Sequence, residues 1–413
     1  MNSCLTNAKN ASREIARLSD SMRAEILSAI ADRIEAETDG LLEANYKDLS
    51  LMDKSNPLYD RLLLTKDRLA AIAADMRKVA SLPSPLKKLS LDTILPNGLH
   101  LKRVSVPFGV IGVIYEARPN VTFDVFSLCF KAGSACVLKG GKDADNSNSA
   151  EAALIRRVLR QYGVNPDGLS LLPSTHEAAA EMLNAVGYVD LVIPRGGRKL
   201  IEFVRRNAAV PCIETGAGVV NTYFDAEASL EIGKAVVRNA KTRRVSVCNA
   251  LDCLIINSSR LSDLPALVED LASAKVPVEI FADQRAHSAL TGRYPYLNHA
   301  DENSFGTEFL DYKMAIRTVD NLQEALEHID KFGSGHSEAI VTDNPETAEA
   351  FRQEVDAACV YVNAPTSFTD GAQFGFGAEI GISTQKLGAR GPMGLEQICT
   401  YKYVIDGNGQ TRP

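Results

Sequence analysis

The sequence predicts an α/β protein with two lobes, each built on a parallel sheet, and a small separate β-hairpin. From residue 110 onward, short apolar runs alternate with amphipathic helical segments, which is the pattern of parallel βαβ units. An Asn97-Gly98 pair lies between two strand-like runs, as in a two-residue hairpin turn. The 413 residues are enough for two or three domains, each with its own core.

The N-terminal region favours helices. Apolar residues over 15–34 recur at spacings of three and four, so they share one helical face. Gly40 is expected to interrupt this pattern, which resumes over 41–51. A further helix is expected over 65–80, with Thr65 as its N-cap, because a threonine hydroxyl accepts a free backbone N–H at a helix start.

The pattern then changes to strands. Apolar runs over 91–95 and 99–106 flank the Asn97-Gly98 turn, and a buried strand follows over 110–115. Further strands are expected at 135–138, 170–172, 190–193, 254–256, 278–281, 315–319, 339–342 and 359–362. Helices are expected at 146–162, 176–186, 197–207, 262–274, 321–330 and 345–355. The segment 364–392 is Gly-rich and loop-like, and 397–405 is expected to close the fold as a strand.

Charge and cysteine content argue against several classes of protein. The net charge is −7, from 45 basic and 52 acidic side chains, which disfavours broad binding to nucleic acid or to a membrane surface. Eight cysteines are too few for a disulfide scaffold, none forms a CxxC pair, and no histidine lies at metal-ligand spacing. We find no signal-peptide pattern and no apolar run of about 20 residues. We therefore expect a cytoplasmic protein without a metal site.

Cys248 is the first candidate for chemistry. It lies between a helix that ends near Arg244 and a strand that begins near Asp252, a junction where a thiol can face a cleft. Lys241, Arg243 and Arg244 bring positive charge nearby, which favours the thiolate, the form that attacks carbonyl groups. The alternative is that Cys248 is a small buried hydrophobic residue.

Two Gly-containing turns each follow a predicted strand and precede a predicted helix. The Lys139-Gly140-Gly141-Lys142 turn offers two cations to the ribose and phosphate of a nucleotide. The Arg195-Gly196-Gly197 turn opens a helix, whose free N–H groups suit a phosphate. Neither turn is a complete nucleotide-binding fingerprint. Two solvated lysines and a plain strand-to-helix turn remain as alternatives.

Asn120 and Glu214 are the other candidates found from the residues themselves. Asn120 follows a buried strand, where its amide N–H can stabilise an oxyanion or its side chain can cap the helix from 121. Glu214 lies beside a Gly-containing turn, where a carboxylate can contact a cofactor, act as a base or simply be solvated.

Taken together and in this order, the segments resemble the aldehyde dehydrogenase superfamily and, within it, the family of gamma-glutamyl phosphate reductases, also called glutamate-5-semialdehyde dehydrogenases. The resemblance covers almost the whole chain. Its most specific blocks are residues 115–122, 139–142, 193–198, 246–251, 332–340, 368–371, 377–384 and 389–396. Two positions depart from the pattern, Val245 where proline is usual and Gly388 where histidine is usual.

The resemblance implies a role for individual residues. Cys248 matches the catalytic thiol, and Asn120 matches the residue that forms the oxyanion hole with the cysteine N–H. The implied cofactor-binding residues are Lys139, Gly140, Lys142, Arg195, Gly196, Gly197, Glu214 and, by a looser match, Glu308. Candidates for binding the substrate are Arg118, Arg243 and Arg244, by charge and position, and Ser367 and Thr369.

The implied activity is reduction of gamma-glutamyl phosphate to glutamate 5-semialdehyde through a cysteine thioester, with release of phosphate, in proline biosynthesis. We expect NADP(H) as the cofactor because the 139–142 turn has two cations, whereas an acid at the ribose favours NAD. The resemblance also implies a homo-oligomer, joined through the hairpin and the C-terminal strand. The upstream glutamate kinase is a candidate partner.

The resemblance further implies three parts of the chain. Residues 1–225 form a cofactor-binding domain interrupted by the hairpin 90–107, residues 226–390 form the catalytic domain, and the strand in 391–413 joins the oligomerisation element. Three alternative functions stay open: an aldehyde dehydrogenase that hydrolyses its thioester, a cysteine acyltransferase or hydrolase without nicotinamide, and a non-catalytic nucleotide-binding protein.

Overall fold

The chain folds into two compact units. The structure, a computed structural model, describes residues 2–54, 56, 59–116, 118–216 and 218–412. Unit 1 comprises Met1–Thr215, Gly375–Gly381 and Met393–Pro413, and unit 2 comprises Gly216–Phe374 and Ile382–Pro392. The first division between these units falls at Thr215, and the C-terminal part of the chain returns twice to unit 1.

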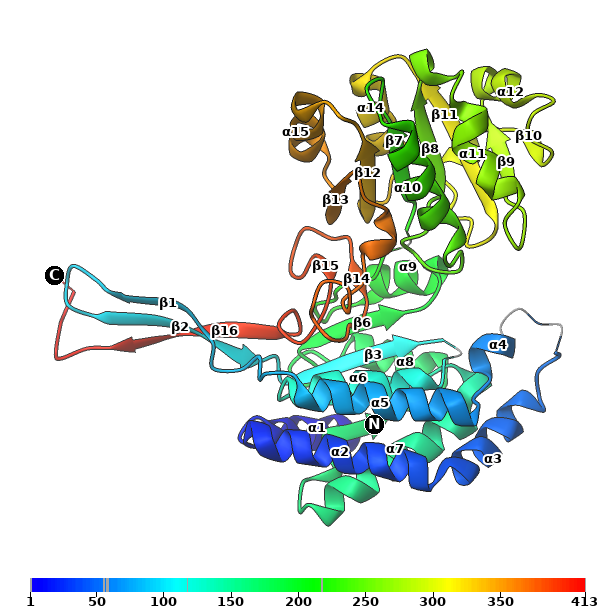
Figure 1. The fold of residues 1–413 in the computed structure, drawn as a ribbon. Helices are drawn as coiled ribbons and strands as arrows, with labels where there is room; N and C mark the ends of the chain where they lie inside the picture. The colour runs from blue at the N-terminus through cyan, green and yellow to red at the C-terminus, as the bar shows by residue number, and fades with distance from the viewer. Residues whose placement is uncertain (1, 55, 57–58, 117, 217, 413) are drawn as a thin grey trace. The chain divides into compact units, whose positions relative to one another are not determined.

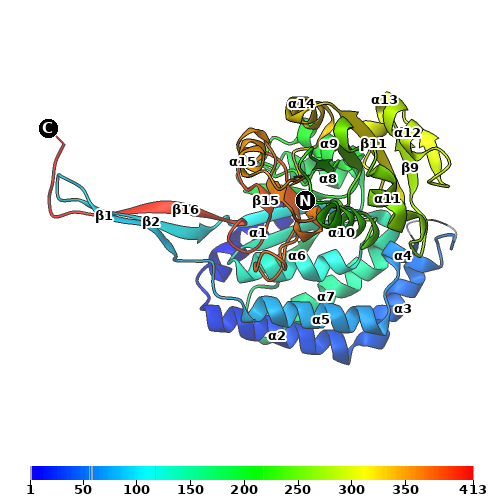
Figure 2. The same cartoon turned by 45° about the horizontal axis from the view of Figure 1, so that its top comes forward.

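Unit 1 contains a four-stranded parallel sheet. Its strands are β3 (Val110–Tyr115), β4 (Ala135–Lys139), β5 (Leu169–Leu171) and β6 (Leu191–Arg195), in the order β5-β4-β3-β6. Every residue of β3 is buried, which explains its continuous apolar sequence. The helices α6 (Asn120–Lys131) and α7 (Asp145–Gln161) pack against this sheet, and α2 (Asp20–Ala36) and α5 (Lys66–Ser81) form a layer over them (Figure 2).

The remaining helices of unit 1 are α1 (Asn2–Ile15), α3 (Thr38–Leu49), α4 (Tyr59–Leu62), α8 (His176–Leu183) and α9 (Arg198–Asn207). The apolar pattern over 15–34 belongs to two helices, because the Ser19 hydroxyl caps α2 by accepting the Met22 N–H. The predicted interruption at Gly40 is wrong, since α2 ends at Ala36 and Gly40 lies inside α3. Thr65 caps α5 as predicted.

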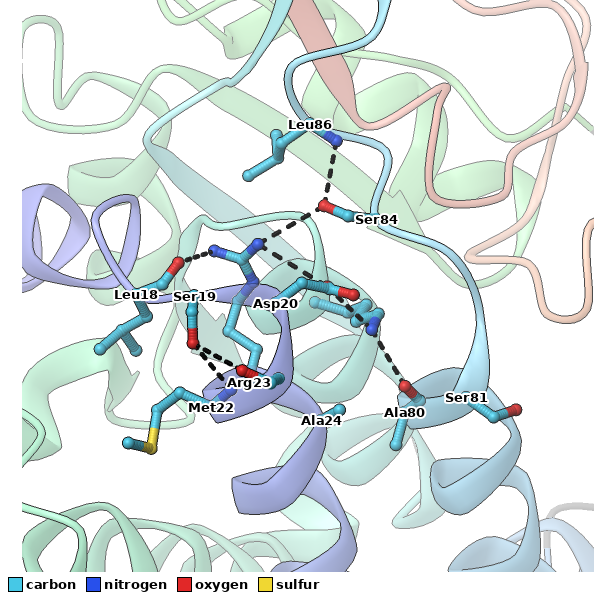
Figure 3. A network of polar contacts seen from close by, with 12 residues as sticks. Leu18, Ser19, Asp20, Met22, Arg23, Ala24, Ala80, Ser81, Ser84 and Leu86 are labelled. Carbon is cyan, nitrogen blue, oxygen red and sulfur yellow. Dashed lines mark hydrogen bonds and ion pairs between the residues drawn. The ribbon is translucent and has the colours of Figure 1, made fainter.

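A network of charged side chains ties α2 and α5 to the C-terminal end of α6. Arg23 donates to the Leu18 carbonyl at 2.8 Å and forms an ion pair with Asp20 (Figure 3). Lys131, which is almost fully buried at the end of α6, forms an ion pair with Asp20 at 2.9 Å and donates to the Ala80 carbonyl at 2.9 Å. Because buried charges need such partners, this network fixes the end of α6 that lies opposite Asn120.

Unit 2 contains a seven-stranded parallel sheet in the order β10-β9-β11-β8-β7-β12-β13. The strands are β7 (Asn221–Phe224), β8 (Cys253–Asn257), β9 (Glu279–Ala282), β10 (Leu297–His299), β11 (Lys313–Val319), β12 (Ser337–Val341) and β13 (Cys359–Val362). In β8, Leu254 and Ile256 join one apolar cluster, whereas Cys253 and Ile255 join another. The strand is therefore covered on both faces, as its apolar sequence requires.

The helices of unit 2 are α10 (Leu230–Thr242), α11 (Leu264–Ala272), α12 (Gln284–Leu290), α13 (Glu302–Phe305), α14 (Leu322–Phe332) and α15 (Pro345–Glu354). The predicted loop-like segment 364–392 contains two short paired strands, β14 (Ile382–Ser383) and β15 (Gly391–Pro392). The two parallel α/β lobes predicted from the sequence are thus confirmed.

A separate antiparallel ribbon consists of β1 (Leu89–Ile94), β2 (His100–Pro107) and β16 (Cys399–Asp406), with β2 in the centre (Figure 1). Gly98 adopts a φ of 82° in the turn that joins β1 and β2. Large apolar side chains are exposed on the ribbon, at Leu89, Leu91, Ile94, Tyr401, Tyr403 and Ile405. The expected oligomer contact through this ribbon stays a prediction. Within the residues described, no helix combines the length and apolar character that a bilayer span requires.

Candidate active site

Cys248 lies in the turn between α10 and β8, and its side chain is partly exposed. Gly218 packs directly against this turn, because a Cβ atom at Gly218 would lie 1.7 Å from the Cys248 carbonyl oxygen. Only glycine permits so close an approach of two backbone segments. Cys253, in contrast, is fully buried, and burial raises the pKa of its thiol well above the ordinary value. The structure therefore favours Cys248 as the reactive thiol and Cys253 as a packing residue.

Asn249, the residue after Cys248, is bonded to the segment 366–369. Its Nδ2 donates to the Thr369 carbonyl at 2.9 Å, and its own carbonyl accepts the Thr366 hydroxyl at 2.9 Å. The Ser367 hydroxyl donates to Asn239 Oδ1 at 2.6 Å, and the fully buried Thr369 hydroxyl bonds to Ser337 and Tyr361. The hydroxyls of Ser367 and Thr369 thus bond to protein groups beside the Cys248 turn, and their contact with substrate stays a prediction.

Two buried groups of opposite charge, Asp252 and Lys241, lie in the same region. Asp252 accepts the backbone N–H of Phe309 at 3.0 Å and that of Val220 at 3.3 Å. Lys241 is fully buried, with its Nζ 6.0 Å from the centre of the Phe309 ring. Burial lowers the pKa of Lys241 and raises that of Asp252, and each charge opposes the shift of the other. Asp252 therefore ties two loops of unit 2 together as their common acceptor.

Glu308 belongs to one of these loops. Its Oε1 accepts the Gly218 N–H at 3.0 Å, and Gly218 contacts the Cys248 backbone. Unit 2 therefore brings together the predicted thiol and the residue loosely matched to a cofactor-binding glutamate. Arg243 and Arg244 are exposed where α10 ends, whereas Lys241 faces Asp252 and Phe309.

In unit 1, Asn120 is the first residue of α6, so the alternative that it caps this helix is wrong. Its Nδ2 donates to Asp124 Oδ2 at 2.7 Å, one helical turn further on. Burial raises the pKa of Asp124 to about 6, and the bond from Asn120 partly opposes this shift. Asp124 was not predicted from the sequence, although the spacing of four residues places its side chain and that of Asn120 on one helical face.

The 139–142 turn begins where β4 ends. Lys139 is partly buried, and burial lowers the pKa of its ammonium group against the opposing charge of Asp145. Gly140 lies under a buried side chain, because a Cβ atom there would meet Asn148 Nδ2 at 2.2 Å. Lys142 is exposed. A partly desolvated cation beside an exposed one suits an anionic ligand, so the turn fits the phosphorylated ribose of a nucleotide.

The 195–197 turn joins β6 to α9. The Gly197 N–H donates to Glu116 Oε2 at 2.8 Å, so a carboxylate already lies at this helix N-terminus. A cofactor phosphate bound at Gly197 would face this carboxylate. Arg195 is partly buried and has Asp124 among its neighbouring charges. Glu214 is also partly buried, and its charge adds to the burial that raises the pKa of Cys212.

Arg118 is partly buried just before α6. In the described parts of the chain, no group of three or more His, Cys, Asp or Glu side chains is placed to hold a metal ion.

Comparisons with known proteins show the family of the chain. The model of the aldehyde dehydrogenase family matches residues 313–404. The chain is 60% identical to gamma-glutamyl phosphate reductase of Pelodictyon phaeoclathratiforme over 99% of this chain and 98% of the relative. It is also 60% identical to that of Bacteroides thetaiotaomicron, over 100% of this chain and 99% of the relative.

A solved structure is similar over the same length. The crystal structure of gamma-glutamyl phosphate reductase from Thermotoga maritima has a TM-score of 0.95 and 38% sequence identity, covering 100% of this chain and 99% of that one. These similarities confirm the resemblance noted in the sequence. The chain belongs to the gamma-glutamyl phosphate reductase family of the aldehyde dehydrogenase superfamily.

Proposed function

We propose that this protein reduces gamma-glutamyl phosphate to glutamate 5-semialdehyde with NADPH and releases phosphate, as a cytoplasmic step of proline biosynthesis. The observation that carries the proposal is the partly exposed Cys248 thiol, in a chain that is 60% identical over its length to proteins of that name. A fully buried thiol at this position would have argued against covalent chemistry.

In the first step, the Cys248 thiolate attacks the acyl carbon of gamma-glutamyl phosphate. A carbon–sulfur bond forms, and phosphate departs with the electron pair of the broken carbon–oxygen bond, leaving a thioester. Asn120 stabilises the oxyanion that develops on the acyl oxygen, a contribution of about 3 kcal/mol for one such donor. Phosphate is a good leaving group, so this step needs no strong general base, and we assign Glu214 to the cofactor rather than to proton transfer.

Lys139, Gly140 and Lys142 would hold the phosphorylated ribose of the cofactor, and the turn of residues 195–197 would approach its pyrophosphate. Glu308 would orient the nicotinamide ribose. The bound cofactor supplies the hydride that reduces the acyl carbon. When the semialdehyde leaves, the carbon–sulfur bond breaks and Cys248 returns to the thiolate form.

The cations near the motifs are the candidates for the phosphate group of the substrate. Arg118 precedes the helix that begins with Asn120, and Arg243 and Arg244 precede the Cys248 turn. A guanidinium binds phosphate through charge-assisted hydrogen bonds, which favours arginine at such a position. We also propose that the ribbon of β1, β2 and β16 joins subunits of a homo-oligomer, and that glutamate kinase supplies the labile acyl phosphate.

The reverse reaction provides the test. Oxidation of glutamate 5-semialdehyde leaves a thioester on Cys248, which phosphate must attack if the proposal is right. The rate of NADP reduction should therefore require inorganic phosphate and saturate with it, and arsenate should replace it. An equal steady rate in phosphate-free buffer would show that water is the acceptor and that the enzyme is a hydrolytic aldehyde dehydrogenase.

A further inference from the structure

A small pocket of unit 1 carries side chains of both charges. It is lined by α6, by the end of β6 and by the returning segment 375–381. Asp124, Arg195 and Glu379 supply its charged groups, and Val121, Val125, Leu128 and Ile380 supply its apolar wall. The pocket therefore presents both charges and an apolar wall to one end of a small ligand.

Asp124 links this pocket to the proposed oxyanion donor. Its Oδ2 accepts from Asn120 Nδ2 at 2.7 Å. An ionised carboxylate only accepts hydrogen bonds, so it must face the amide nitrogen of Asn120 and not the amide oxygen. One N–H of that amide is used by Asp124, and the second remains for an oxyanion. Asp124 is thus placed both to orient Asn120 and to accept a bond from a cationic ligand group.

Arg195 brings the opposite charge to the same pocket. Its guanidinium lies over Gly381, where a Cβ atom would be 2.6 Å from Nη1. Gly381 has a φ of 151°, so both its conformation and this close approach require glycine. The positive charge of Arg195 acts on Asp124 across the pocket. A guanidinium offers two parallel N–H donors to a carboxylate, which a lysine cannot do.

We propose, on the basis of the function proposed above, that this pocket binds the amino-acid end of the substrate, with Asp124 and Glu379 on the α-ammonium group and Arg195 on the α-carboxylate. Two methylenes separate that end from the reacting carbonyl carbon, and the apolar side chains of α6 line the pocket beside them. Asn120 and Asp124 are one turn apart on α6, so one helix holds the reacting oxygen and the α-ammonium group.

Three aldehydes separate the two contacts. Glutamate 5-semialdehyde carries both head groups, 5-oxopentanoate lacks the α-ammonium group, and 4-aminobutanal lacks the α-carboxylate. For each we would measure kcat/KM of oxidation with NADP and phosphate. A charge-assisted contact contributes about 1.5–3 kcal/mol, so the wild-type protein should prefer the complete substrate by roughly 10-fold to 150-fold over each analogue.

The variants then assign each preference to a residue. Asp124→Asn keeps an acceptor for Asn120 but removes the charge, so it should lower the preference over 5-oxopentanoate to less than about 5-fold. Arg195→Met should lower the preference over 4-aminobutanal to a similar extent. Glu379→Gln provides a second test of the ammonium contact if Asp124→Asn fails to fold. Glu43→Gln, an exposed acid of α3, is the control that should preserve both preferences.

The amino aldehydes cyclise, but this cyclisation affects the measurements on the wild-type protein and on each variant equally. The change in preference between the two proteins is therefore independent of it. Preferences in the variants equal to those of wild type would overturn the assignment of the pocket. A wild-type protein that oxidises none of the three aldehydes would instead refute the proposed function. The two failures are therefore distinguishable.

Discussion

Gly218→Ala tests whether the Cys248 turn is held in position by the backbone beside it. The added Cβ atom would lie 1.7 Å from the Cys248 carbonyl oxygen and 2.9 Å from its Cα atom. Since Cβ contacts shorter than 3.0 Å are essentially never seen, one segment must move by more than 1 Å. A displacement of about 1 Å at a reacting group costs on the order of 10²-fold in rate. We expect kcat to fall by roughly this factor, equivalent to about 2.7 kcal/mol.

The assay is phosphate-dependent oxidation of glutamate 5-semialdehyde, combined with the rate at which iodoacetamide alkylates Cys248. Both rates should change in Gly218→Ala, because the substitution moves the thiol. The free energy of unfolding should fall by about 1–3 kcal/mol, the usual cost of forcing an atom into a packed site.

Gly40→Ala is the matched control. Gly40 lies in α3 with no atom within 4 Å of an added Cβ, so the variant should keep full activity and gain about 0.5–1 kcal/mol of stability. A Gly218→Ala protein with kcat within threefold of wild type would refute the claim that this contact positions the thiol.

Three further predictions concern the nucleophile, the cofactor and acid stability. Cys248→Ser should lower activity by several orders of magnitude while NADP binding survives, and near-normal turnover of this variant would exclude a covalent thioester. Cys253→Ala, the control, should reduce thermal stability more than turnover. Lys142→Glu should shift the ratio of kcat/KM values from NADP(H) toward NAD(H), and an unmodified protein that already prefers NAD(H) would contradict the assignment of the turn. Burial lowers the pKa of His336 to about 4. Between pH ~6.5 and ~4, the imidazole therefore takes up a proton only in the unfolded chain. The free energy of unfolding should decrease as the pH is lowered through this window, by at most about 1.4 kcal/mol per pH unit. His336→Gln should make this slope shallower in urea unfolding, and an unchanged slope would show that His336 does not contribute.

Strands with a short apolar sequence were predicted well. The strand over 110–115 was placed with its correct bounds, as was the strand over 359–362, because each is a short apolar run bounded by a turn or a polar residue. β7 was missed, since Asn221 and Thr222 give it no apolar run. The backbone of this strand makes a tertiary contact that no local pattern reveals, since the Asn221 N–H donates to the buried Glu338 of β12.

The candidate site was predicted in part for a related reason. Motifs identify residues that are adjacent in sequence, such as Cys248 and Asn249, but not the contacts that fix them. The contact of Gly218 with Cys248 joins loops that only the folded sheet brings together. The pocket at Arg195 depends on the return of segment 375–381 to unit 1, which no local pattern reveals. Asp124 is different, because its spacing of four residues from Asn120 was a local signal that could have revealed it, although it was not predicted.

The pairing of β16 with β2 also constrains how the protein can be made. Lys102 of β2 and Asp406 of β16 form an ion pair although 304 residues separate them in sequence. On the ribosome, β2 is synthesised long before β16, so the ribbon stays incomplete until β16 has also been synthesised. During that interval the exposed edge of β2 is available to other strands, including those of neighbouring nascent chains. Closing so long a loop costs conformational entropy, but this cost rises only with the logarithm of loop length, so the long separation of β2 and β16 has little effect on stability. The risk of wrong pairing at the edge of β2 is therefore kinetic and lasts only until β16 pairs with it.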